Sequence, residues 1–214
     1  MTAVKVVRFL DREPEGLRGR WAQALAAGDP VGRPSRVAVA VPLSGFPEPP
    51  FAAVDLQWFP DVAEALANEA WLASVDPELA AGSCRVVVEE VVVRGQDYLA
   101  GRWKAGGDRY KMMSFGRRHP DLTPVEFSAQ WRGHAGRLGG EQIPDEVRGL
   151  AYVQNHPVPV EGHEWPFDAV NEVWFERLDD LRRRRDWFAA RPGAVPSFMS
   201  PDHLWSMFVR ESPL

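Results

Sequence analysis

Apolar and polar residues alternate in short segments along the whole chain, and a few longer segments with helical spacing interrupt them. A period of two is typical of strands that bury one face, whereas apolar residues three or four apart are typical of helices. In the first half the pattern predicts strands at 4–10, 35–43 and 84–93, a helix at 20–28, and a strand then a helix within 51–71. In the second half it predicts strands at 110–116, 147–156 and 203–211, a helix at 123–138, and a strand then a helix within 167–187. Each half therefore has the predicted order βαββαβ.

The helix at 123–138 carries the clearest end signals. Thr123 is a suitable N-cap, Pro124 fits the first helical position, and Glu126 stands where a capping box requires an acidic residue. Gly139 and Gly140 then predict its end.

Part of the chain is repeated. The segment FAAVDLQWFPDVAEALANEAW (51–71) matches FDAVNEVWFERLDDLRRRRDW (167–187), including a Trp-Phe pair and the final tryptophan. The same offset places VVVRG (91–95) on MFVRE (207–211), and a slightly shorter one places VKVVRFLDR (4–12) beside YKMMSFGRR (110–118). A repeat this long indicates a small domain copied in tandem, because solenoid repeats have periods of about 20–50 residues. We expect an N-terminal repeat at 1–94, a glycine-rich linker at 95–109 and a C-terminal repeat at 110–214.

A duplicated βαββαβ unit solves a packing problem. One such unit has a sheet with helices on one face only, and its bare face must be covered. Two units packed bare face to bare face form an α+β barrel, so the fold class predicted is α+β, with two fused ferredoxin-like repeats that make an intramolecular dimeric α+β barrel. Since the chain supplies both halves, we expect a monomer that is a pseudo-dimer, with a homodimer as the alternative.

Composition narrows the setting. The only cysteine, Cys84, cannot form an internal disulfide, and the chain lacks a secretory signal and any apolar run long enough to cross a bilayer. We therefore expect a cytoplasmic protein with no membrane partner. The net charge is −5, and the basic cluster at 182–185 follows Asp179 and Asp180 at a spacing that allows ion pairs along a helix. Nucleic acid is accordingly not an expected partner.

The C-terminal repeat resembles a known family. KMMSFGRRHPDLTPVEFSAQWRGHAGRL, followed by GLAYVQNHPV and FDAVNEVWF, is similar to the EthD-like family of the dimeric α+β barrel superfamily. The resemblance covers 110–210 well and 4–94 only weakly: Trp21 stands roughly where Trp131 does, but no residue there corresponds to His134. We therefore expect one working polar site in the C-terminal half and an apolar or vestigial one in the N-terminal half.

His134 is the first candidate for catalysis. In the predicted helix it shares a face with Phe127, Trp131 and Leu138. A lone inward histidine is more often a hydrogen-bonded core residue, but the resemblance implies a functional histidine here, and the two interpretations have about equal weight. Trp131, on the same face, is a candidate to border a ligand.

The strand 148–156 supplies further candidates. Alternation places Tyr152, Gln154 and His156 on one face and Asn155 on the other. His156 and Tyr152 are predicted to assist catalysis, although His156 before Pro157 is also explained as a surface residue. Asn155 is included among the substrate-binding candidates, with a structural role in a turn as the favoured alternative.

Four more residues complete the predicted substrate-binding set: Met113, Phe115, Arg117 and Trp174. Arg117 is suited to an anionic or phenolic oxygen, although Asp121 offers it an ordinary salt bridge. Trp174 matches Trp58 of the other repeat, which favours a role in the fold.

Absent motifs exclude several chemistries. The sequence has no phosphate-binding glycine loop, no HExxH, no GxSxG and no cysteine pair, and its five histidines lack metal-ligand spacing. We expect no metal and no cofactor, with haem only a remote option suggested by relatives of the barrel. The resemblance implies a cofactor-independent tailoring enzyme, of cyclase, dehydratase or isomerase type, that acts on a polyketide or aromatic molecule by histidine proton transfer. The alternatives are a cofactor-free monooxygenase and a non-catalytic binder of hydrophobic small molecules.

Overall fold

The computed structural model describes residues 3–13, 15–27, 31–81, 83–134, 137–138, 141–191 and 195–214. Its strands are β1 (Ala3–Leu10), β2 (Arg36–Pro42), β3 (Ala53–Phe59), β4 (Ser83–Arg94), β5 (Arg109–Arg118), β6 (Arg137–Leu138), β7 (Glu141–Gln142), β8 (Ala151–Pro157), β9 (Ala169–Phe175) and β10 (Met199–Pro213). Its helices are α1 (Leu17–Ala26), α2 (Val62–Val75), α3 (Pro77–Ala80), α4 (Gln96–Ala105), α5 (Pro124–Arg132) and α6 (Leu178–Ala189). Among these helices none is long and apolar enough to cross a membrane.

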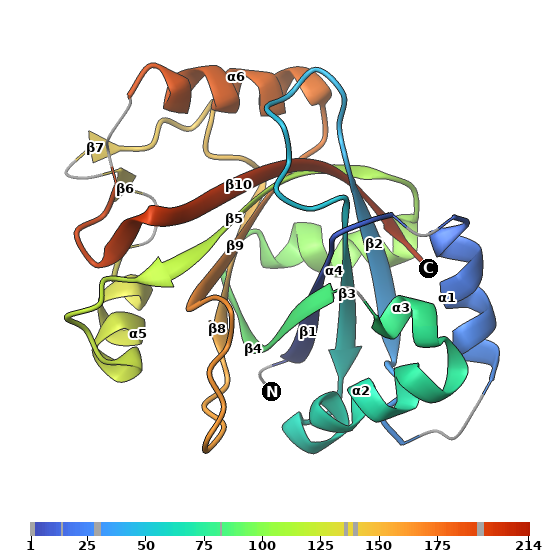
Figure 1. The fold of residues 1–214 in the computed structure, drawn as a ribbon. Helices are drawn as coiled ribbons and strands as arrows, with labels where there is room; N and C mark the ends of the chain where they lie inside the picture. Colours follow the sequence, from blue (N-terminus) through green and yellow to red (C-terminus); the bar gives the residue numbers. More distant parts are fainter. Residues whose placement is uncertain are drawn as a thin grey trace.

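The long strands form one closed antiparallel barrel with the order β1-β3-β2-β10-β5-β9-β8-β4, in which β4 also pairs with β1 (Figure 1). Within each half the first strand lies between the third and fourth strands, and the second strand lies at the edge. The predicted α+β barrel is therefore confirmed. The sheets are joined edge to edge by the pairs β2–β10 and β4–β8, however, in addition to facing each other across the interior. Closure removes the unpaired edges that two separate sheets would expose.

The first and third strands of the two halves have matching registers. Lys5 of β1 lies opposite Trp58 of β3, and Lys111 of β5 lies opposite Trp174 of β9. These are the pairings that the sequence alignment of the halves predicts. The common ancestry of the halves stays a prediction.

The last strands correct that alignment. Lys5 lies opposite Val88 on β4, and Lys111 lies opposite Val209 on β10. Val209 is thus the counterpart of Val88, whereas the sequence match of VVVRG with MFVRE pairs it with Val93. Val-rich strands resemble one another at several offsets, so only the pairing with β1 and β5 identifies the correct one.

Helix α5 begins as predicted and ends earlier. The Thr123 side chain accepts from the Glu126 backbone, and the Glu126 carboxylate accepts from the Thr123 backbone at 2.8 Å, which confirms the capping box. The helix ends at Arg132, with Gly133 as its C-cap, and not at residue 138. Glycine at 133 weakens the helix before the predicted glycine pair is reached.

The predicted linker at 95–109 is largely helical, because α4 occupies most of it. Its Arg102 is buried, stacks on the rings of Trp58 and Trp174 at 5.3 and 5.1 Å, and lies 3.6 Å from Glu211. The segment between the halves therefore adds a side chain to the barrel interior.

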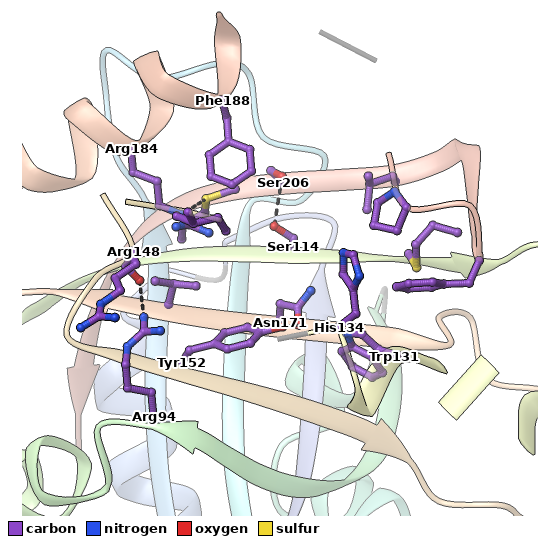
Figure 2. Close-up of a pocket in the computed structure, with 17 residues that line it drawn as sticks. Arg94, Ser114, Trp131, His134, Arg148, Tyr152, Asn171, Arg184, Phe188 and Ser206 are labelled. Carbon is purple, nitrogen blue, oxygen red and sulfur yellow. Dashed lines mark hydrogen bonds between the residues drawn. The ribbon is translucent and has the colours of Figure 1, made fainter. Parts of the chain in front are cut away.

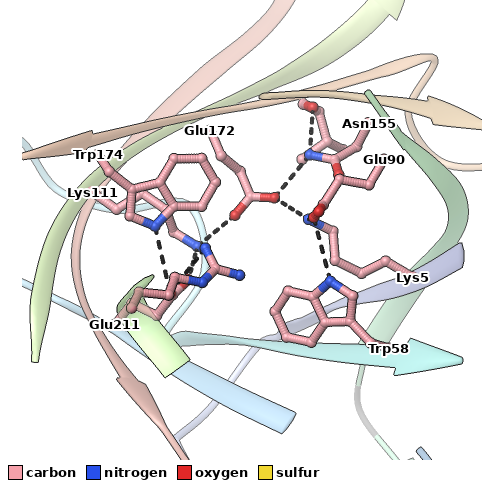
Figure 3. Close-up of polar contacts among 10 residues, drawn as sticks. Lys5, Trp58, Glu90, Lys111, Asn155, Glu172, Trp174 and Glu211 are labelled. Atoms are coloured by element: carbon pink, nitrogen blue, oxygen red, sulfur yellow. Dashed lines mark hydrogen bonds and ion pairs between the residues drawn. The ribbon is translucent and has the colours of Figure 1, made fainter. Parts of the chain in front are cut away.

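The barrel interior is filled. Aliphatic residues and the rings of Phe9, Phe115 and Phe167 pack at one part of it. Charged side chains occupy another part (Figure 3), and the ion pairs are Lys5–Glu90 at 2.7 Å, Lys5–Glu172, Lys111–Glu172 at 2.6 Å and Lys111–Glu211. Each of these buried charges has an opposite charge within contact, as charges in a protein interior require.

Candidate functional site

A cavity of about 190 Å³ lies outside the barrel, between the outer face of the C-terminal half of the sheet and helices α5 and α6 (Figure 2). Its apolar wall includes Met112, Trp131, Phe188, Phe198 and Met199. The volume is comparable to that of the engineered cavity of roughly 150 Å³ that binds one benzene ring. The space therefore suits a compact molecule of one to a few rings.

The floor of the cavity has a polar row that crosses four strands. Gln154, Asn171, Ser114 and Ser206 are successive cross-strand neighbours on β8, β9, β5 and β10. The hydroxyl oxygens of Ser114 and Ser206 are 3.3 Å apart, and all of these residues except Gln154 line the cavity. Side chains opposite each other on one sheet face are in contact, so residues far apart in sequence form one polar strip.

Tyr152 orients the amide in this strip. Its hydroxyl donates to Asn171 Oδ1 at 2.9 Å and accepts from Gln154 Nε2 at 3.3 Å. Burial raises the pKa of Tyr152, so its phenol stays protonated and continues to donate. Because Oδ1 of Asn171 is occupied, its amide nitrogen remains as a donor on the cavity side, with no hydrogen bond to any described residue.

His134 lines the same cavity, and Arg94, Arg148 and Arg184 lie at its opposite end (Figure 2). It lies in the turn after α5, where its backbone N–H donates to Trp131 O at 3.0 Å, so the predicted helical stripe does not place it. Its ring meets the edge of Phe198 at 4.9 Å between centroids. The structure thus brings three predicted residues, His134, Tyr152 and Trp131, to one cavity.

His156 is close to this site but does not line it. It packs on Trp131 at 4.3 Å between ring centroids, and its ring nitrogens contact Ser128 Oγ at 3.1 Å and Gln154 Oε1 at 3.2 Å. Burial, with a smaller contribution from Arg132, lowers the pKa of His156 to about 4. His156 is therefore a neutral imidazole that is hydrogen-bonded through both ring nitrogens and packs against Trp131. It was predicted to lie in the pocket, but it contacts a residue of the cavity wall instead of the cavity.

The other predicted substrate-binding residues lie elsewhere. Met113, Phe115, Asn155 and Trp174 point into the barrel interior, because alternation along β5, β8 and β9 gives them the face opposite to the cavity. Asn155 donates to Glu172 at 2.8 Å and to the Val170 carbonyl at 3.0 Å, so its contacts are structural, but it lies within β8 and not in the turn that was expected. Arg117 is exposed, and Asp121 pairs with His119.

One end of the cavity, named here the arginine end, is formed by three arginines that were not among the predicted site residues: Arg94, Arg148 and Arg184. Arg94 comes from β4 of the N-terminal half, where it pairs with Tyr152 of β8. Arg184 belongs to the basic run 182–185, for which the sequence predicts ion pairs with Asp179 and Asp180 along the helix. Arg182 and Arg183 do form surface pairs, with aspartates three residues earlier, but Arg184 is buried. The only sequence signal for the burial of Arg184 is the helical periodicity of 178–189, which places Arg184 on the same face of the helix as Leu181.

The equivalent place in the N-terminal half is filled. Arg8 of β1 lies opposite Asp55 of β3, and the equivalent pair in the C-terminal half is Ser114 and Asn171. The long side chain of Arg8 therefore occupies the position at which the small side chain of Ser114 leaves space. Trp21 packs there in a stack with Trp71 at 6.4 Å. The expectation of apolar side chains was wrong, because Arg8 and Asp55 are buried there with Gln57, and burial raises the pKa of Asp55 to about 6.

No group of three or more metal-ligating side chains of His, Cys, Asp or Glu occurs among the described residues. Within the cavity the chemical resources are an imidazole, a phenol, an amide, two hydroxyls and guanidinium groups. These groups can donate hydrogen bonds, stabilise a negative oxygen and move a proton.

No protein-family model matches the sequence, and no curated protein matches it. Solved structures share its fold. A protein described as anthrone oxidase-like superposes with a TM-score of 0.59 at 10% identity over 99% of this chain and 93% of that one. A provisionally named monooxygenase from Fusobacterium nucleatum superposes with a TM-score of 0.50 at 9% identity over 99% and 92% of the two chains. At such identities the likeness concerns the fold alone.

Proposed function

We propose that the chain is a cofactor-independent enzyme that binds a compact aromatic or polyketide-like molecule in the cavity and moves a proton next to one of its carbonyl groups. One observation carries this proposal: a single cavity with mostly apolar walls contains the His134 ring and the Asn171 amide donor. A base beside a donor for the developing oxyanion is the minimal arrangement for enolisation.

The residues have separate roles in this proposal. His134 takes the proton from carbon, and the electron pair moves onto the carbonyl oxygen to give an enolate. Asn171 donates its N–H to that oxygen, and Tyr152 keeps the amide in the required orientation. Return of the proton to another atom gives an isomer. If the proton on His134 passes to a hydroxide that leaves from the β carbon, water and a dehydrated product form. If the enolate carbon instead attacks a second carbonyl of the same molecule, whose oxygen takes the proton from His134, the product is cyclised.

Oxygenation is the second candidate function, and the fold shared with an anthrone oxidase-like protein favours it. Here the enolate transfers electrons to dioxygen, and a CH₂ group with O₂ becomes a C=O group with one water. No metal or flavin is required for the balance, because the substrate is the reductant and dioxygen the oxidant. Both candidates share the first proton transfer.

The proposal extends to the history of the chain. We infer that the halves descend from one βαββαβ unit, which is supported by their common strand order and by the matching Lys-Trp pairs on their first and third strands. A monomer fits a barrel that closes within one chain. The cytoplasm remains the proposed location, because the single cysteine can form no internal disulfide.

The test separates proton transfer from oxygenation. Anthrone has a CH₂ group across its central ring from the ketone, and this group is acidic because its anion is conjugated with the ketone oxygen. Its hydrogen–deuterium exchange in anaerobic buffer therefore reports the base, and quinone absorbance in air reports oxygenation. His134→Ala should lower the rate above background by about 10²–10⁴-fold, while exposed His163→Ala should not.

The His134→Gln variant distinguishes a base from a positioning group, since glutamine forms hydrogen bonds but carries no proton at neutral pH. Full activity in His134→Gln would refute the proton-transfer role. Tight ligand binding without exchange or oxidation of any aromatic or polyketide substrate would identify the protein as a binder.

A further inference from the structure

We propose that the arginine end of the cavity binds a carboxylate of the substrate, so that a compact aromatic acid is preferred to a neutral ring system of the same shape. This inference deepens the proposed function and rests on it only in calling the bound molecule a substrate. The binding claim itself requires no turnover. It is carried by Arg94, Arg148 and Arg184, which line one end of the cavity without any acidic residue among the described lining residues.

Arg184 is the central observation. Its side chain is 7% exposed, yet no carboxylate of the described residues forms an ion pair with it. Its Nη1 donates to the Val147 carbonyl at 2.9 Å, its Nε contacts Met112 Sδ at 3.1 Å, and the guanidinium stacks on Phe188 at 4.6 Å. Those partners are neutral. A buried charge without a counter-ion is costly, and an anionic ligand removes that cost.

The arginines next to Arg184 are also positively charged, so they add to the positive potential at this end of the cavity instead of neutralising it. Burial, with a smaller contribution from Arg94, lowers the pKa of Arg184 to about 10, so the group is still charged at neutral pH but is destabilised by its surroundings. Burial and then Arg148 likewise lower the pKa of Arg94. Among the described residues, the only acidic side chain that pairs with any of the three is Asp145, which lies 3.0 Å from Arg148 and is largely exposed, so that water screens the pair.

Two of these arginines also hold backbone. Arg94 donates to the carbonyls of Arg148 and Gly149, and Arg184 donates to that of Val147, so both fasten the loop that precedes β8. A purely structural role would therefore explain two of the three. It does not explain Arg148, whose side chain holds no backbone in the described structure and still lines the cavity.

Charge selectivity here must be local. The chain has a net charge of −5, so its overall field repels an anion. The guanidinium fork matches the planar carboxylate and forms charge-assisted hydrogen bonds with it. Figure 2 shows the arginines at one end, His134 and Trp131 at the other, and Asn171 between them. A bound aromatic acid thus has its carboxylate at the arginine end and its reacting carbon near His134.

The experiment compares two ligands of the same shape. Titration calorimetry at pH 7 with 2-naphthoate and with neutral 2-naphthamide measures the preference for the anion. We expect naphthoate to bind about 10–100-fold more tightly, as a buried charge-assisted hydrogen bond implies. Arg148→Gln should reduce this ratio by about 3–10-fold without disturbing the loop, because that arginine is partly exposed.

Arg184→Gln should abolish most of the preference, and Arg184→Lys should retain part of it. Arg183→Gln, on the exposed face of the same helix, is the matched control and should leave the ratio unchanged. Thermal unfolding followed by circular dichroism confirms that each variant is folded. Because Arg148→Gln removes no backbone contact, the inference remains testable if Arg184→Gln fails to fold.

Equal binding of the acid and the amide would overturn the inference, as would failure of both probes to bind or an unchanged ratio in folded Arg148→Gln and Arg184→Gln. None of these results involves turnover. Loss of proton transfer in His134→Ala with intact anion preference would instead refute the proposed function while the arginine end remains supported.

Discussion

Acidification should destabilise the protein through His156. Its pKa is lowered from the ordinary 6.5 to about 4 by burial and by Arg132. Between these two values the unfolded chain binds a proton that the folded chain does not, so stability is present above pH 6.5 and is lost as the pH falls. Linkage allows at most about 2 kcal/mol of loss between pH 7 and pH 5. Arg132 is exposed and screened by solvent, so its smaller share of the shift is discounted, and we expect a loss of about 1–2 kcal/mol.

Asp55 acts in the opposite direction within the same pH range. Burial raises its pKa to about 6, so the folded chain binds a proton more readily than the unfolded chain, and acidification adds stability. The wild-type profile is therefore a sum of opposing contributions. The contribution of His156 has to be measured as a difference between the wild type and His156→Gln.

Urea unfolding followed by tryptophan fluorescence at pH 7 and pH 5 gives that difference. His156→Gln should be less stable than the wild type at pH 7, because it loses the contact with Trp131, but the gap should narrow by about 1–2 kcal/mol at pH 5. His163→Gln, at an exposed histidine, is the control. If the gap between the wild type and His156→Gln is the same at both pH values, the assignment of a buried neutral imidazole is refuted.

Two further predictions concern the barrel and the cavity. Glu172→Gln should lower the free energy of unfolding by about 3–5 kcal/mol, because it leaves two buried lysines with less counter-charge. A loss below about 1 kcal/mol in urea unfolding would contradict the burial of Glu172 with Lys5 and Lys111. Tyr152→Phe should reduce turnover about tenfold with little change in stability, because the Asn171 amide loses the donor that orients it. Tyr110→Phe is its control, and a Tyr152→Phe rate equal to that of the wild type would remove the orienting role.

Local signals in the sequence located the elements well. Alternation identified the eight barrel strands, and the residues of the capping box identified the start of α5. Alternation along β8 also separated Tyr152 and His156 from Asn155 correctly. Each of these features depends on residues within a few positions of one another, so the sequence contains the whole physical cause.

The sequence alone therefore determined the barrel strands, the start of α5, the two-part barrel and the candidates His134 and Tyr152, but it did not predict α4 in the expected linker. Tertiary structure decided which strand face borders the cavity, because alternation has a period of two and gives no sign of which side a helix will cover. Met113, Phe115 and Trp174 do not belong to the site, because their side chains lie on the strand face that points into the barrel interior. Tertiary structure also brought Arg94 of β4 to Tyr152 of β8 and buried Arg184 without a carboxylate, since strand pairing and helix docking across the chain have no local signal.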